Sequence, residues 1–542
     1  MKISACWDRE RDTPESCPFV AMAPKYGETK KSNLQLAYML AANGLNVLRF
    51  DHTCHIGESA GDPGAFTLSR GLGDILGCID FLETRFGCKT STLLASSLSA
   101  RTAIRAAAVD HRITQLVCIV GVVNLQSTLS IVYGEDIVSN YLGGKRWGLT
   151  DNFFGRQADW DAFLGDLCEQ QFHSRSEVER EVETIHVPVV FFSGDDDAWA
   201  DIADVEAVIA KSRHGRLIRL PDTKHEVREN TAAWAKVYQD VVEVVAAEAW
   251  GVAKKPMALR MPSQRCLLGQ NRTERLRLRE VLARDNDEKQ FWSDYLGKYV
   301  VMEHVVDFGG YLDLVCDLLS PLGSGDAVLD AGCGTGLWGI WLMRRLALLK
   351  EMETPVSYVG VDLTPSGLAA ASGRHAAIQA EALRLERDLP RRTVDLFFAS
   401  SDFDRCDETG AHAAIPQFAD GFFSAVCCSL VLSYLERPHL LLRELKRVLR
   451  PEGRIVVSSM KPHCDVSNIY RDFVGSRATE QEVESARNLL GGVREILVKQ
   501  EIGMYIFYDG EELARLVSDA GFSNVQVYSA FGDQVVAVSA NA

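Results

Sequence analysis

Near its middle the chain reads Val328-Leu329-Asp330-Ala331-Gly332-Cys333-Gly334-Thr335-Gly336. An apolar strand at 327–329 leads through this turn into a helical pattern over 337–348. Glycine at three alternate positions lets the backbone approach a nucleotide-like ligand, and the start of the helix stabilises a carboxylate on that ligand. A pyrophosphate-binding turn would need Gly-x-Gly-x-x-Gly, which is absent here. The stretch therefore predicts an α/β sheet whose first strand ends at a ligand.

The sequence following this stretch continues the alternation of strands and helices. Asp362 ends the next strand, where its carboxylate is placed to accept both hydroxyls of a ribose. The pattern closes on a hairpin of 525–529 with 535–538. We expect the remaining strands at 358–361, 394–398, 425–429 and 455–458.

Further motifs follow in a fixed order. Ser401-Asp402 comes after the third strand, 415–423 precedes the fourth, 429–434 follows it, and 444–453 leads into the fifth. Together with the glycine turn, this order resembles the class I S-adenosylmethionine-dependent methyltransferase family over residues 298–542. The resemblance implies a Rossmann-like sheet of seven strands that binds S-adenosylmethionine; a sheet of this kind binding another ligand is the alternative. The cofactor residues that it implies are Asp330, Gly332, Gly334, Gly336, Asp362, Leu363, Asp402, Phe403 and Ser429.

The methyl acceptor is not specified by any motif, because methyl transfer mostly requires positioning and needs a base only if the acceptor loses a proton. Tyr434, His439 and His463 are the candidates on the acceptor side, with His463 as a candidate base. His439 is expected to start a helix instead. The aromatic segment 291–295, with Tyr299, fits either a lid or a core helix.

The N-terminal half has a second α/β alternation. Apolar runs separated by helical patterns predict a parallel sheet with crossover helices. The alternation lapses over 124–184, which predicts a cap inserted over the sheet. The expected strands are 19–22, 45–50, 92–95, 116–122, 187–192 and 217–220.

One of these strands runs into Leu94-Ala95-Ser96-Ser97-Leu98-Ser99-Ala100-Arg101. A nucleophile elbow needs small residues two positions either side of the nucleophile. Only Ser97 meets this condition, with Ala95 and Ser99 as its flanks. Ser97 is therefore the predicted nucleophile.

A serine nucleophile also needs a base and an orienting carboxylate, which in this fold follow in the order Ser, Asp, His. The strand at 187–192 runs into Asp195, Asp196 and Asp197, and the strand at 217–220 runs towards His225. We assign Asp197 and His225, and Asp195 and Asp196 are the alternatives for the acid.

The segments 50–57, 94–101, 121–125, 197–199 and 225–230 together resemble the acyl-transferase family of bacterial bioluminescence, which are α/β-hydrolases that release fatty acids from acyl carriers. The resemblance covers 19–244 and implies the triad Ser97, Asp197 and His225. It also implies an oxyanion hole made by the amide of Leu98 and a second donor near Lys25 or Tyr26, of which we select Tyr26.

Composition limits the partners. A chain of 542 residues exceeds what one core organises, and its formal charge of −16 disfavours nucleic acid. No apolar run is long enough for a membrane helix and no secretory signal is apparent, so we expect a soluble, cytoplasmic protein. The 14 cysteines lack Cys-x-x-Cys pairs, so we expect buried thiols and no metal.

The sequence thus predicts an α/β-hydrolase domain at 1–250, a linker with a candidate lid helix at 251–297, and a methyltransferase domain at 298–542. The hypothesis for function is a serine thioesterase or acyl hydrolase fused to a methyltransferase, both acting on one small or carrier-bound acyl metabolite. An acyl-carrier protein is the expected partner. The alternative is a methyltransferase whose inactive hydrolase-like half recruits that carrier.

Overall fold

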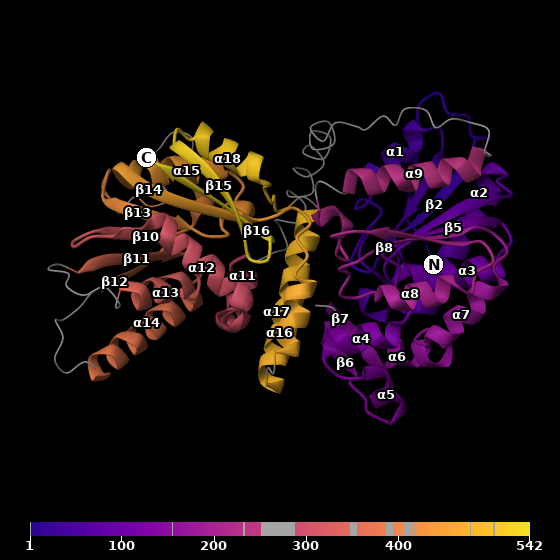
Figure 1. Ribbon diagram of the computed structural model, residues 1–542, viewed down its shortest axis with the longest axis horizontal. Coiled ribbons are helices and arrows are strands. Elements are labelled where there is room, and N and C mark those ends of the chain that lie inside the picture. Colours follow the sequence, from indigo (N-terminus) through magenta and orange to yellow (C-terminus); the bar gives the residue numbers. More distant parts are fainter. Residues whose placement is uncertain are drawn as a thin grey trace. The chain divides into compact units, whose positions relative to one another are not determined.

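The computed structural model describes residues 2–153, 156–230, 234–250, 288–346, 355–385, 394–405, 415, 418–476, 479–501 and 504–542 (Figure 1). The chain forms two compact units. Unit 1 comprises Met1–Arg277 and Asp465–Gly503, and unit 2 comprises Leu278–Cys464 and Met504–Ala542. Most of the expected linker, 251–287, lies outside the described residues.

Unit 1 is built on a seven-stranded sheet in the order β1-β3-β2-β4-β5-β8-β9. All neighbours are parallel except β1, which pairs antiparallel with β3. The sequence missed β1, because four half-exposed residues at a sheet edge carry no clear alternation. The strands are β1 Ala5–Asp8, β2 Phe19–Ala23, β3 Asn46–Phe50, β4 Ser91–Ser96, β5 Ile113–Ile119, β8 Val189–Gly194 and β9 Gly215–Leu220.

Both faces of this sheet are buried, as expected for parallel strands. Alternate residues of β2 show the division: Phe19 and Ala21 pack with α2, α3, α7 and α8, whereas Val20 and Met22 pack with α1 and α9. The helices are α1 Leu34–Ala42, α2 Leu68–Phe86, α3 Ser99–Val109, α7 Arg175–Thr184, α8 Ile202–Ile209 and α9 Trp234–Trp250.

The segment between β5 and α7 forms a cap, as the lapse in the alternation predicted, but it ends before α7, whose Val178 and Val182 pack in the core of the sheet. Its apolar side chains, including Leu129 and Trp160, form one cluster that also contains Tyr26 and Leu98. The cap elements are α4 Leu125–Tyr133, α5 Ile137–Leu142, α6 Trp160–Glu169 and the two-stranded sheet of β6 Leu149–Phe153 with β7 Arg156–Asp159.

Unit 2 has a second seven-stranded sheet, in the order β12-β11-β10-β13-β14-β16-β15. The first five strands in this order are parallel, and β16 pairs antiparallel with both β14 and β15. The predicted fold class and the terminal hairpin are therefore confirmed. The strands are β10 Ala327–Ala331, β11 Val356–Asp362, β12 Val394–Ser400, β13 Phe423–Cys428, β14 Leu449–Met460, β15 Ser523–Ala530 and β16 Val535–Asn541.

Helices cover this second sheet as well. The α15 and α18 side chains join Leu329, Val359 and Val426 in one core on a single face. In Figure 1, α12, α13 and α14 lie together in the red part of unit 2. The helices are α11 Glu288–Lys298, α12 Val306–Leu319, α13 Leu337–Leu346, α14 Pro365–Leu385, α15 Pro438–Val448 and α18 Gly510–Asp519.

The two compact units differ from the predicted domain ranges in one respect. We expected 298–542 to be one continuous domain, but 465–503 belongs to unit 1. This segment carries α16 Ser467–Gly475 and α17 Glu480–Glu501. Helical periodicity identifies such helices, but it does not identify the core that receives their apolar faces. In addition, none of the helices within the described ranges is long and apolar enough to cross a membrane.

Candidate active sites

A strained turn presents Ser97. The residue follows β4 directly, and α3 begins two residues later. Its φ of 53° is left-handed, a conformation that non-glycine residues rarely adopt. The Ser97 carbonyl accepts hydrogen bonds from the amides of Ala100 at 3.0 Å and Val122 at 3.1 Å, which hold the turn in place. The structure thus gives Ser97 the backbone of a nucleophile elbow.

Ser97, His225 and Asp197 come together in one buried relay. Ser97 Oγ lies 2.7 Å from His225 Nε2, and His225 Nδ1 lies 2.8 Å from Asp197 Oδ2. All three side chains are buried. This order of hydroxyl, imidazole and carboxylate matches the geometry by which a histidine deprotonates a serine.

The acid in this relay is held by its own loop. Asp197 Oδ1 accepts the amides of Trp199 at 2.8 Å and Ala200 at 3.0 Å. Asp195 instead accepts a hydrogen bond from exposed Arg219, and Asp196 is exposed. The geometry therefore favours Asp197 over its two neighbours.

The expected oxyanion donors lie beside the elbow. The Leu98 amide has no hydrogen-bond acceptor among the described residues, so it is available to a ligand. Tyr26 lies in the turn after β2, with its ring 4.7 Å from that of His55. The next amide, that of Gly27, donates to His55 Nε2 at 3.1 Å. Tyr26 and Leu98 also share the cap cluster, but their roles towards an oxyanion stay a prediction.

A buried polar group that the sequence did not reveal ties the β2 turn to the elbow helix. Ser99 Oγ donates to the Pro24 carbonyl at 2.5 Å, and it lies 3.2 Å from His52 Nε2. His52 Nδ1 is 3.3 Å from Asp74, which also accepts the Thr53 amide at 2.8 Å. Only tertiary structure brings these residues together, because they come from four separate segments.

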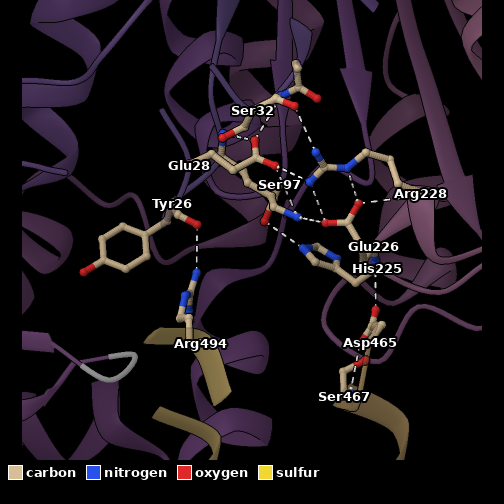
Figure 2. A network of polar contacts seen from close by, with 12 residues as sticks. Tyr26, Glu28, Ser32, Ser97, His225, Glu226, Arg228, Asp465, Ser467 and Arg494 are labelled. Atoms are coloured by element: carbon tan, nitrogen blue, oxygen red, sulfur yellow. Dashed lines mark hydrogen bonds and ion pairs between the residues drawn. The ribbon is translucent and has the colours of Figure 1, made fainter. Parts of the chain in front are cut away.

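Charged side chains next to the triad histidine form a second network (Figure 2). Glu226 binds Lys25 and accepts from Arg228 at 2.7 Å, and Arg228 also donates to Glu28 at 2.8 Å. Burial opposes the charge on Lys25, but Glu226 and Glu28 more than offset this, so the pKa of Lys25 is raised. The network connects the His225 loop to the turn that carries Tyr26.

In unit 2 the glycine turn has left-handed backbone at all three predicted positions, with φ of 84° at Gly332, 52° at Gly334 and 77° at Gly336. A Cβ on Gly332 would lie 2.1 Å from Val431, and one on Gly336 would lie 2.5 Å from His375. Tight packing within the protein therefore demands glycine at these two positions, in addition to any approach by a ligand.

Asp362 lies at the end of β11, adjacent to this turn. Its Oδ2 accepts the Gly334 amide at 2.9 Å, and its Oδ1 accepts the Thr364 amide at 2.8 Å and the Thr364 hydroxyl at 2.7 Å. The carboxylate thus orders the glycine turn, a role that the sequence did not predict. Each oxygen retains acceptor capacity, and the contact to a ribose stays a prediction.

Asp330 is buried beneath the turn, with 2% of its surface exposed. Tyr358 donates its hydroxyl to Asp330 Oδ2 at 2.6 Å. Burial raises the pKa of Asp330 to about 7, the Tyr358 hydrogen bond opposes this rise, and the nearby charge of Asp362 adds to it. Asp330 is therefore a structural acid of the turn as well as a predicted cofactor residue.

The other predicted cofactor residues directly follow the strands β11, β12 and β13. The Ser429 hydroxyl is 2.6 Å from that of Tyr311, which is 2.7 Å from that of Ser458. Tyr311 comes from α12 and was not identified from the sequence. Leu363 is half-buried after Asp362. Half-buried Asp402 accepts the Asp404 amide at 3.1 Å, whereas Phe403 packs into the core.

Aromatic rings gather on the expected acceptor side. The Tyr434 ring lies 4.5 Å from that of Trp292 in α11 and 4.9 Å from that of Tyr505. Burial raises the pKa of the Tyr434 hydroxyl. A Cβ on Gly334 would meet Leu296 of α11 at 3.0 Å, so this helix contacts the glycine turn. The segment 291–295 thus lies at the site, as the lid hypothesis requires.

The two histidines considered as acceptor-side residues differ in position. His463 follows β14 in a turn with φ of 57°. His439 is exposed in the first turn of α15, so its prediction as the start of a helix is confirmed. Within the described part of the chain, no group of His, Cys, Asp and Glu side chains is arranged to hold a metal ion.

Comparison with known proteins gives a separate result for each half. Residues 20–254 match the family model described as acyl transferase, and residues 302–527 match the model described as a methyltransferase domain. An acyl transferase of Vibrio campbellii is 30% identical over 214 residues, which are 39% of this chain and 69% of that protein. An acyl transferase of Photobacterium leiognathi is 30% identical over 237 residues, which are 41% of this chain and 74% of that protein.

Solved structures resemble the halves only loosely. A monoacylglycerol lipase of Paleococcus ferrophilus gives a TM-score of 0.38 at 17% identity, covering 46% of this chain and 100% of its own. A SAM-dependent methyltransferase of Aquifex aeolicus gives 0.26 at 17% identity, covering 42% and 87%. The fold assignment therefore rests on the strand orders and the family matches.

The raised pKa of Asp330 has a testable consequence for stability. The folded state retains the proton between about pH 4 and pH 7, where the unfolded chain has lost it, so stability falls as pH rises through this window. In Asp330→Asn the side-chain amide oxygen can accept the hydrogen bond from the Tyr358 hydroxyl, and the side chain carries no charge at any pH. We expect the stability advantage of this variant over the wild type to grow between pH 5 and pH 8 by at most about 3 kcal/mol, because about two pKa units of the linkage fall in this range. Calorimetric unfolding without added cofactor measures this gain, and a difference that is equal at both pH values contradicts it.

Proposed function

We propose, from the premise that this chain belongs to the acyl transferase family and also carries a methyltransferase domain, that it is a bifunctional enzyme. Its serine site cleaves an acyl thioester, and its second site methylates the same metabolite with S-adenosylmethionine. The observation that carries the proposal is the Ser97 hydroxyl 2.7 Å from His225, which in turn contacts Asp197. An inactive docking domain would have no need of this buried relay.

In the proposed reaction Ser97 Oγ attacks the thioester carbonyl carbon while His225 Nε2 takes the hydroxyl proton. Asp197 stabilises the resulting imidazolium through Nδ1. The carbon–sulfur bond then breaks, and His225 returns the proton to the departing thiol. Water attacks the acyl-serine in the same way, which releases the carboxylic acid and restores the Ser97 hydroxyl.

Negative charge develops on the carbonyl oxygen in both steps. The Leu98 amide next to Ser97 has no acceptor within the described ranges, which supports its assignment as an oxyanion donor. The Tyr26 turn is the candidate for the second donor. Both residues belong to the apolar cap cluster, which supports an acyl group as the substrate.

When bound, S-adenosylmethionine supplies an electrophilic methyl group. The residues of unit 2 fit this cofactor, since a left-handed glycine turn at the end of β10 lies beside the Asp362 carboxylate at the end of β11. Gly332, Gly334 and Gly336 would hold the amino-acid part and Asp362 the ribose. Tyr434 and His463 would orient the acceptor, with His463 as the base for an acceptor that must lose a proton.

The serine site is tested with a fluorophosphonate probe. We expect the probe to label the wild type at Ser97, and Ser97→Ala to abolish labelling. Asp197→Asn should slow labelling by about 10³-fold or more, because the imidazole loses its orienting carboxylate. The exposed neighbour Asp196→Asn is the matched control and should label normally. Intact-mass spectrometry reads the result, and a wild type that takes up no probe would favour the docking alternative.

The cofactor site is tested by calorimetric titration with S-adenosylmethionine. Loss of the ribose contact and of the order in the glycine turn should make Asp362→Ala bind at least tenfold more weakly. Asp519→Ala removes an exposed carboxylate at the end of α18 and serves as the control. Equal affinity for wild type and Asp362→Ala would show that the ribose assignment is wrong.

The shared metabolite is tested by isotope tracing. The wild type is incubated with an acyl-carrier thioester and methyl-labelled S-adenosylmethionine, and the products are read by mass spectrometry. We expect the label in the released acyl product, and we expect Ser97→Ala to leave it on the carrier-bound thioester or to prevent its transfer. Release of an unlabelled acid across acyl-carrier substrates would mean that the two sites serve different metabolites.

A further inference from the structure

A segment from the C-terminal half of the sequence contributes to unit 1. After β14 the chain enters unit 1 at Asp465, forms α16 and α17, and leaves after Gly503 to continue towards α18. We call Asp465–Gly503 the inserted segment. Its contacts with unit 1 fall on the same loops that carry the serine site.

The first contact is made next to the triad histidine (Figure 2). Asp465 Oδ2 accepts the amide of Glu226 at 2.8 Å, and its Oδ1 accepts the amide of Ser467 at 2.9 Å. Asp465 is buried. Because Glu226 follows His225 directly, this carboxylate fixes the backbone from which the imidazole projects.

The second contact lies beside the triad acid. The Tyr470 hydroxyl donates to the Val132 carbonyl of the cap at 2.7 Å, and the Tyr470 ring lies 6.2 Å from the ring of Trp199. The Trp199 amide is one of the two backbone amides that hold Asp197. Tyr470 therefore bridges the cap and the loop of the acid.

The third contact is made at the turn that carries Tyr26, as Figure 2 shows. Arg494 donates from Nη2 to the Tyr26 carbonyl at 2.7 Å, and its guanidinium lies 5.1 Å from the centre of the Tyr26 ring. The other end of the same peptide group, the Gly27 amide, donates to His55. The Tyr26–Gly27 peptide is therefore held at both ends, which restricts the rotation that would redirect the turn.

A fourth contact reaches the cap. Arg487 donates to the Tyr133 carbonyl, and its guanidinium lies 5.2 Å from the centre of the Tyr133 ring. A charged donor binds a carbonyl more strongly than a neutral one, so two such arginines order their targets well. The inserted segment thus binds the histidine loop, the acid loop, the Tyr26 turn and the cap.

We propose that the inserted segment completes the serine site, and that Arg494 and Asp465 are positioning residues for acyl transfer to Ser97. Arg494 sets the turn that carries the second oxyanion donor, and Asp465 sets the loop that carries His225. Neither side chain reacts with the substrate. The inference rests on the proposed function of the serine site, and it makes acyl chemistry in the N-terminal half depend on residues from the C-terminal half.

The proposal is tested in the full-length chain with p-nitrophenyl acetate, whose small acyl group makes little use of the cap. Arg494→Met retains the length of the side chain but loses the donor, and we expect kcat to fall at least tenfold with KM changed less than threefold. Arg494→Lys keeps a charged donor and should recover most of this loss. A role in packing alone would affect both variants equally.

Asp465 is tested by Asp465→Asn. The carboxylate accepts hydrogen bonds from two backbone amides, one at each oxygen, whereas the asparagine side chain has only one oxygen that can accept. We expect at least a fivefold lower kcat with little change in KM. Arg471→Ala is the matched control, because exposed Arg471 lies in the same segment and is hydrogen-bonded to its neighbour Asp472. It should keep wild-type kcat within twofold. The affinity of every variant for S-adenosylmethionine should stay within twofold, which reports that unit 2 is folded.

The outcomes separate this inference from the function on which it rests. If the wild type neither takes up the fluorophosphonate nor cleaves the ester, the proposed serine chemistry fails. If the wild type reacts but Arg494→Met and Asp465→Asn react at the same rate, the serine chemistry stands and the positioning role is overturned. If Arg494→Met is too unstable to assay, a tenfold or greater loss of kcat in Arg494→Lys, with S-adenosylmethionine affinity retained, also overturns it.

Discussion

Each site depends on one constraint: a buried parallel strand must turn into the following helix within a few residues. Both solutions use left-handed backbone, at Ser97 after β4 and at Gly332, Gly334 and Gly336 after β10. For a residue with a side chain this conformation costs roughly 1–2 kcal/mol. The cost at Ser97 is offset by two amides that bind its carbonyl, and glycine avoids it in unit 2.

The ends of neighbouring strands carry the residues that contact each of these turns. The edge at which parallel strands end is shared, so residues distant in sequence meet there. In unit 1 the end of β8 approaches the His225 loop so closely that a Cβ on Gly194 would lie 2.1 Å from the Thr223 carbonyl oxygen. In unit 2 Asp362 binds the amide of Gly334 across the adjacent strand end. Close backbone contact thus sets the geometry of both sites.

The inserted segment adds further contacts to the serine site, although it lies in the half of the sequence that carries the methyltransferase motifs. Asp465, Tyr470 and Arg494 are separated by at most 29 positions, yet they reach three different loops of the serine site. Two helices and the residue that leads into the first can do this, because side chains along their length project towards successive parts of one surface. Residues from the C-terminal half of the sequence therefore belong to unit 1.

The sequence by itself predicted both sheets apart from the edge strand β1, the cap, and the three residues assigned to the triad, with two alternatives for the acid. Ser97 followed from the steric demand of its turn, and His225 and Asp197 followed from strand ends and chain order. The sequence left Asp195 and Asp196 open, because three adjacent carboxylates are equivalent until the backbone aims one of them at the histidine. It also identified Asp362 and the glycine turn, because those residue types at two strand ends have a local signature.

Only the tertiary structure decided the contacts that support these residues. Tyr311 on Ser429, Leu296 beside Gly334, and Ser99 on the Pro24 carbonyl join segments that share no local pattern. The same is true of the inserted segment, whose helical period is visible in sequence although its destination is not. A period reports that a helix has an apolar face, whereas the partner of that face is set by complementary packing across the folded chain.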